Sequence, residues 1–193
     1  MKQIQRILTT SNIDAITADF LSDLASLGAS IDGKRGVALF TTLKREKLVD
    51  GPYPNVSLFE AANRIMSDIV ILQGVKELLL NTLFPFSSYT VEFGNENNNG
   101  FDIRASSGDY LLVGEAFNVA PSFFQGKKAA ALKKIRIKGA DATHKIIVYN
   151  SDAVADNYAP RVEDGLFHVV VDFGFEKVKI IPGQENKVKV IHS

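Results

Sequence analysis

The sequence has 193 residues, of which 46% are hydrophobic and 23% charged, and this ordinary globular balance excludes a disordered or fibrous protein. Its 22 basic and 22 acidic residues cancel, which excludes a uniformly basic nucleic-acid coat but leaves room for a local basic surface. The absence of cysteine excludes a disulfide framework and a thiolate zinc site.

The first third of the chain is expected to be helical. Residues 12–28 carry apolar side chains at helical spacing up to Gly28, and residues 36–49 can form a second helix that ends at the breakers in DGPYP. A third helix is expected over 57–81, with a bend at Gly74.

The middle of the chain changes to strand-like patterns. Residues 88–94, SYTVEFG, are β-branched and aromatic and predict a strand, followed by the polar loop 95–100. Residues 101–105 alternate apolar and polar side chains, 106–109 form a turn, and 110–119 predict a mostly apolar strand. Two of these strands therefore form a hairpin.

The chain then returns to a helix and ends in strands. Pro121 and Ser122 mark the start of a helix over SFFQGKKAAALKKI, in which Gly126 is an interior weakness. Residues 144–150 form a near-continuous apolar strand, as in strands buried on both faces. Three further strand-like stretches, 166–175, 177–183 and 186–193, form either a second small sheet or extra edge strands.

These elements predict an α/β (α+β) protein with a helical N-terminal part, a mixed central sheet and extra C-terminal strands. The whole chain, 1–193, is expected to be one domain with a core over about 56–150, a helical part over 1–55 and a strand-rich part over 160–193. The N-terminal residues lack the apolar core of a signal peptide, and no apolar stretch approaches the about 20 residues of a membrane span. We therefore expect a cytoplasmic protein.

The predicted hairpin presents two carboxylates. With Ser107 and Gly108 at the centre of the turn, Asp102 faces Val113, and Glu115 is its diagonal neighbour about 7–8 Å away on the same face. Two carboxylates at this spacing can share a cation. A slip of one residue in register would put them on opposite faces.

These residues resemble the PD-(D/E)XK nuclease superfamily, which includes many restriction endonucleases. Asp102 in GFDIRA matches the family's first acidic position, and Glu115 in VGEAFNV matches the glutamate of its E-x-K motif. Glu60 in VSLFEAANRI is similar in placement to a helical glutamate that often completes the family's metal shell. The resemblance covers roughly residues 56–150 and implies a restriction-endonuclease-like core.

The chain departs from the family at the lysine of the motif, because Phe117 occupies that position. Some members of the family resemble this chain in carrying the cation on a neighbouring helix. Lys127 and Lys128 can then serve, and Asn118 and Gln125 are weaker substitutes.

The resemblance implies a restriction-type enzyme that hydrolyses DNA phosphodiester bonds. Mg²⁺ would be held by Asp102, Glu115 and a backbone carbonyl beside Glu115, with Glu60 as a further ligand, and Lys127 or Lys128 would add positive charge near the nucleophile. DNA is the expected partner, and a homodimer is expected because a two-fold DNA site needs two copies.

Each of these residues also has a structural interpretation. Asp102 can cap a turn or pair with Arg104, and Glu60 forms a capping box with Ser57. The basic run 126–138, to which Lys127 and Lys128 belong, can be a solvated helix face rather than a phosphate-contacting surface. Glu115 is harder to explain in this way, because an unpaired carboxylate within an apolar strand is costly.

Two other functions remain open from the sequence. The chain can be a catalytically inactive nucleic-acid or protein interaction module that keeps the fold, which the missing lysine favours. It can also be an unrelated α+β domain in which the two carboxylates have no shared role.

Overall fold

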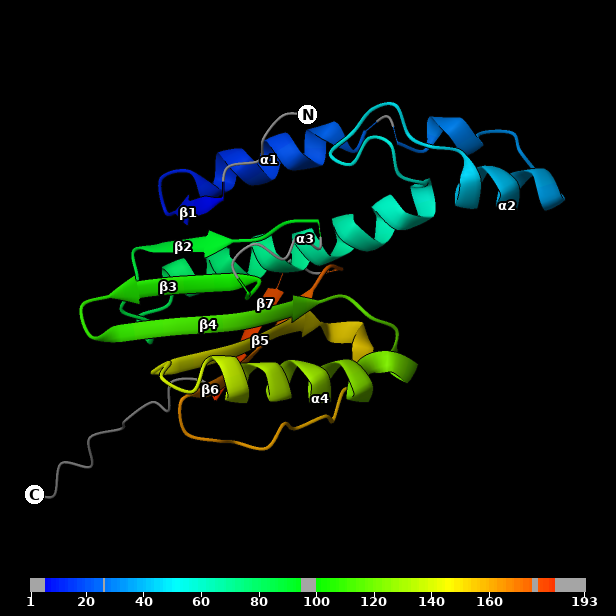
Figure 1. The fold of residues 1–193 in the computed structure, drawn as a ribbon. Helices are drawn as coiled ribbons and strands as arrows, with labels where there is room; N and C mark the ends of the chain where they lie inside the picture. The colour runs from blue at the N-terminus through cyan, green and yellow to red at the C-terminus, as the bar shows by residue number, and fades with distance from the viewer. Residues whose placement is uncertain (1–5, 26, 95–99, 175–176, 183–193) are drawn as a thin grey trace, which may run out of the picture.

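The computed structural model describes residues 6–25, 27–94, 100–174 and 177–182 (Figure 1). Within these residues the helices are α1 (Ile13–Asp23), η1 (Ala29–Ile31), α2 (Gly36–Arg45), α3 (Leu58–Leu80), α4 (Pro121–Lys138) and η2 (Ser151–Ala153). The strands are β1 (Ile7–Thr9), β2 (Ser88–Val91), β3 (Ile103–Ser107), β4 (Tyr110–Phe117), β5 (His144–Asn150), β6 (Leu166–Asp172) and β7 (Lys177–Ile181).

The seven described strands form one mixed sheet in the order β1-β2-β3-β4-β5-β6-β7. Strands β1, β2, β3 and β4 pair with one another antiparallel, β4, β5 and β6 pair parallel, and β7 pairs antiparallel with β6 at the edge. The parallel step from β4 to β5 is made by α4, as a parallel crossover requires. The expected α+β class with N-terminal helices and later strands is confirmed.

Two helices cover opposite faces of this sheet. Helix α3, supported by α1, packs across one face, and α4 lies on the other face against β4 and β5 (Figure 1). Each face has its own apolar cluster, one around Val70, Tyr89 and Ile103 and the other around Phe124, Ile135 and Ile147. The sheet therefore separates the α3 side from the α4 side, and β5 is buried on both, as its apolar sequence predicts.

Helix α3 shows how the local sequence determines an element. Its start is capped by Ser57, whose Oγ accepts the Glu60 N–H at 3.2 Å. Gly74 lies within one continuous helix and not at the end of a separate segment. A Cβ at Gly74 would come within 2.6 Å of Val148 Cγ1, so the glycine allows α3 to approach β5 closely.

Several sequence expectations need correction at the ends of the chain. Strand β1 was not expected, and it adds an edge to the sheet by pairing with β2. The C-terminal strands do not form a second sheet, because β6 and β7 extend the central one. The strand expected over 186–193 and most of the loop expected over 95–100 lie outside the described residues.

The hairpin register also differs from the expected one. Ser107 pairs with Tyr110 and Arg104 with Val113, so the turn is centred on Gly108 and Asp109 instead of Ser107 and Gly108. Gly108 has a φ of +55°, which suits the first central position of a type II′ hairpin turn. This register moves each pairing by two residues, so side chains expected to share a face still share it.

Candidate functional site

Asp102 and Glu115 face each other across β3 and β4. The β3–β4 pairing ends at Ile103 and Gly114, the residues next to Asp102 and Glu115, and the charge of Asp102 acts on Glu115, so the two acids are neighbours at this end of the hairpin. Asp102 Oδ2 accepts the Ala116 N–H at 2.8 Å, which fixes this carboxylate beside β4. The expected pair is therefore present on one face, the face that α4 also covers.

Both carboxylates are in an environment that disfavours their charge. Burial raises the pKa of Asp102, and the Ala116 hydrogen bond and the charge of Lys134 only partly oppose this. Burial, followed by the neighbouring charge of Asp102, raises the pKa of Glu115 to about 7. Such a pair is stabilised by any positive charge placed between or beside its two members.

Lys134 supplies a positive charge from α4. Its Nζ lies 2.7 Å from Glu115 Oε1, with the lysine side chain 28% exposed and the glutamate 12%. At this distance the ammonium donates a charge-assisted hydrogen bond to the carboxylate, and both this bond and the charge of Lys134 lower the pKa of Glu115 against the effect of burial. The Lys134 ammonium also lies 5.6 Å from the centre of the Phe101 ring.

The two lysines expected to act at the site lie on different sides of α4. Lys127 interacts electrostatically with Asp102, as Lys134 does, because residues seven apart share one side of a helix. Lys128 instead donates a hydrogen bond to the Tyr158 hydroxyl at 2.8 Å, away from the carboxylate pair. Sequence analysis missed Lys134, although its seven-residue spacing from Lys127 was a usable signal.

Phe117 occupies the family's lysine position and belongs to the apolar core. It is 7% exposed and stacks on Tyr149, with ring centres 6.0 Å apart and planes 14° apart. Its side chain also contacts Phe124 of α4, with ring centres 6.2 Å apart. Packing between β4, β5 and α4 therefore explains the aromatic residue at this position.

Glu60 lies in the first turn of α3, where its exposed side chain forms an ion pair with the half-buried Arg64 at 2.5 Å. A different acid of the same helix lies near the carboxylate pair. Asp68, eight residues further and roughly 12 Å along the axis, is 1% exposed and interacts with the charge of Asp102. Its carboxylate accepts hydrogen bonds from the Tyr53 hydroxyl and from the Gly94 N–H, and burial raises its pKa to about 7.

Glu92 is a second acid that sequence analysis missed. It follows β2 directly, is 3% exposed, and its N–H donates to the Asp102 carbonyl at 2.9 Å. Its charge contributes to the raised pKa of Asp102. The signal was available in SYTVEFG, where a glutamate interrupts a β-branched and aromatic segment.

The carboxylate oxygens of the pair are suitable ligands for a hard cation, but they supply only part of its coordination shell. Asp102 and Glu115 offer carboxylate oxygens, the ligands that Mg²⁺ prefers, and Mg²⁺ is usually bound through one or two carboxylates with substrate phosphates and water completing its shell. Within the described residues no group of three or more His, Cys, Asp or Glu side chains is placed to hold a metal ion. Asp102 and Glu115 would therefore supply at most two carboxylates to such an ion, and Glu60 does not join them in a three-acid group.

Comparison with known proteins gave no relative: no protein-family model, no curated protein and no solved structure matches this chain. None of the helices in the described part of the chain has both the length and the apolar character needed to cross a membrane.

Proposed function

We propose that this chain is a Mg²⁺-dependent endonuclease of the PD-(D/E)XK type that hydrolyses DNA phosphodiester bonds. The observation that carries the proposal is the neighbouring pair of Asp102 and Glu115 with the Lys134 ammonium 2.7 Å from the glutamate. The order α3-β2-β3-β4-α4-β5, with an antiparallel meander and a parallel fifth strand, supports it, because this is the order that the resemblance implies.

In this proposal the two carboxylates would hold the metal, and Lys134 would act in place of the motif lysine, whose position Phe117 occupies. Bound Mg²⁺ would supply Lewis-acid polarisation of the phosphate and a more acidic water. Lys134 orients a water beside Glu115 and adds positive charge where the phosphorane gains negative charge. Lys127, on the same side of α4, attracts the substrate phosphate toward the pair.

Water is the nucleophile and the products are a phosphate end and a hydroxyl end of the cut strand. The water oxygen bonds to phosphorus, the phosphorus–oxygen bond to the leaving sugar breaks, and the leaving oxygen takes up a proton. Cutting both strands of a two-fold DNA site requires two copies of the chain, so a homodimer is part of the restriction-type form of this proposal.

A second candidate is a catalytically inactive nucleic-acid or protein interaction module with the same fold. The observation that favours it is Lys134 itself, because the ammonium already compensates the charge of Glu115 without a metal. In that case the pair of charges stabilises the junction of α4 with the sheet and has no part in hydrolysis.

Plasmid nicking separates the two candidates. The wild-type protein is incubated with supercoiled DNA in Mg²⁺ and in EDTA, beside Glu115→Gln and the matched variant Glu163→Gln, which also loses an ion pair to α4, through Arg136. The nuclease proposal predicts nicking that needs Mg²⁺, survives Glu163→Gln and is lost in Glu115→Gln. Equal nicking by Glu115→Gln and wild type, or none in Mg²⁺ on any DNA, refutes it.

A further inference from the structure

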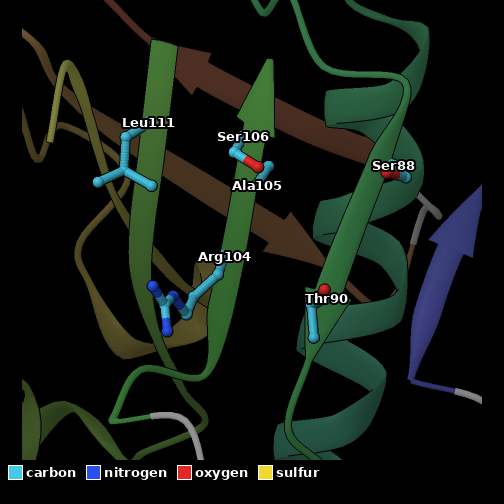
Figure 2. A pocket seen from close by; sticks show the side chains of 6 residues that line it. All are labelled: Ser88, Thr90, Arg104, Ala105, Ser106 and Leu111. Atoms are coloured by element: carbon cyan, nitrogen blue, oxygen red, sulfur yellow. The ribbon is translucent and has the colours of Figure 1, made fainter. Parts of the chain in front are cut away.

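On the sheet face that carries the carboxylate pair, α4 packs against β4 and β5. On the same face β2 and β3 present Ser88, Thr90, Arg104 and Ser106, which we call the β2–β3 strip. Figure 2 shows these side chains on the outer side of the two strands, with Arg104 reaching toward β4. With Ala105 and Leu111 they line a shallow pocket of about 220 Å³.

The strip is continuous with the proposed site. Arg104 is two residues beyond Asp102 on β3, and Ser106 two beyond Arg104, so successive side chains on this face are about 7 Å apart along the strand. Thr90 lies opposite Arg104 and continues the strip onto β2. A ligand that lies along β3 therefore passes from the hairpin end directly to the carboxylate pair.

The chemistry of the strip suits a phosphate backbone. Its members offer one guanidinium and three hydroxyl groups, and the residues that line the pocket include no acidic side chain. Arginine and hydroxyl side chains are standard partners of phosphate and sugar oxygens in nucleic-acid complexes. The pocket is smaller than the 300–1,000 Å³ typical of small-molecule sites, which fits a surface track better than an enclosed ligand.

Positively charged side chains of α4, on the side of the carboxylate pair opposite the strip, complement the same ligand. Lys127 and Lys134 lie along the side of α4 that acts on Asp102, so a strand passing over the carboxylate pair has cations on its α4 side and the strip on its other side. The acidic groups lie between these two surfaces, where a scissile phosphate and its metal would be held.

We propose that the β2–β3 strip binds the sugar-phosphate backbone of the nucleic-acid strand that carries the scissile phosphate, on the side of the hairpin. The inference rests on the proposed function for the identity of that ligand. It assigns to Arg104 a direct phosphate contact and to Ser88, Thr90 and Ser106 hydrogen bonds to backbone oxygens.

Binding to a fluorescein-labelled DNA duplex tests the strip separately from hydrolysis. Anisotropy is measured in a Glu115→Gln background, which cannot cut under the proposed mechanism, at several salt concentrations. Arg104→Ala should weaken binding roughly three- to tenfold and lower the slope of log affinity against log salt by about one. Arg45→Ala, which removes the same charge from α2, should leave both unchanged.

Ser106 gives a test that does not depend on losing an arginine contact. Ser106→Glu should weaken DNA binding by at least as much as Arg104→Ala, while the neutral Ser106→Gln of similar size should bind within about twofold of the parent. Because the chain has no cysteine, Ser106→Cys also introduces a unique thiol. DNA should slow the alkylation of that thiol and should not slow alkylation of the exposed control Thr41→Cys.

The outcomes separate this inference from the nuclease proposal. Strip-dependent binding without Mg²⁺-dependent nicking supports the strip and refutes hydrolysis. Nicking by the wild-type protein, together with unchanged binding in Arg104→Ala and Ser106→Glu, refutes the strip and leaves hydrolysis standing. A wild-type protein that binds no DNA at any salt concentration refutes both.

Discussion

The Lys134–Glu115 charge pair can be tested by removing the ammonium. In Lys134→Ala the glutamate loses its partner within a largely buried setting, since the two side chains are 28% and 12% exposed. Exposed pairs contribute about 0.2–1 kcal/mol, and breaking a fully buried pair costs about 3–5 kcal/mol. The intermediate burial of this pair places the expected loss at about 2 kcal/mol in the free energy of unfolding, or about 1 M in the urea midpoint.

The loss of Lys134 should also lower the rate of DNA nicking, by more than the loss of folded protein alone would explain. If Lys134 stabilises charge at the phosphate, its loss should lower the nicking rate about 10²- to 10³-fold, the effect of removing one positioned donor from an oxyanion site. The rate is measured on supercoiled plasmid at a temperature at which the variant is fully folded, and urea unfolding is followed by circular dichroism.

Lys133→Ala is the matched control, because it removes the same charge from the neighbouring exposed residue of α4. Lys134→Arg keeps the charge and should recover most of the stability. The reasoning is refuted if Lys134→Ala nicks DNA as fast as Lys133→Ala, or if its urea midpoint equals that of the control.

Three further predictions concern the core, pH and helix α4. Phe117→Lys restores the motif lysine at a position that is 7% exposed and stacked on Tyr149. The variant should lose about 3 kcal/mol or more of its free energy of unfolding in urea without nicking DNA faster, and a faster variant would contradict this. Burial lowers the pKa of His168 to about 4, against about 6.5 in the unfolded chain, so the unfolded state binds more protons between these values and stability falls as pH drops through this window, by at most about 3 kcal/mol. Unfolding free energies from pH 7 to 4 should therefore decline less steeply in His168→Leu, and parallel curves for variant and wild type would refute the assignment. Gly126→Ala should raise the melting temperature by about 2–4 °C, because an added Cβ meets nothing within 4 Å and alanine favours the helix by about 1 kcal/mol; a lower melting temperature would show that the glycine is needed there.

The sequence predicted most elements of the core because their patterns are local. The strand over 144–150 is β5 at the same bounds, and α3 begins after the expected cap at Ser57, since a continuous apolar run and a capping serine act within a few residues of themselves. The hairpin was placed one residue early at its turn, because either Ser107 or Gly108 can take the first central position and only the pairing of both strands chooses between them.

Part of the candidate site could also be predicted from local sequence patterns, and part of it could not. That Asp102 and Glu115 share a face follows from the two-residue period of strands, which survives the corrected register. Their electrostatic partners do not follow from any local pattern. Lys134, Asp68 and Glu92 reach the pair from α4, α3 and the end of β2, and their proximity depends on how each helix docks on the sheet.

The sequence by itself thus determined the order of the main helices and of strands β2 to β7, the hairpin, and the placement of two acids on one face, because periodicity and turn chemistry are carried by neighbouring residues. The tertiary structure decided which lysine of a basic helix meets Glu115, which acid of α3 lies near Asp102, and that β1, β6 and β7 join one sheet. Those choices depend on the packing of side chains far apart in the chain, such as Gly74 against Val148, where a missing Cβ sets the approach of a whole helix.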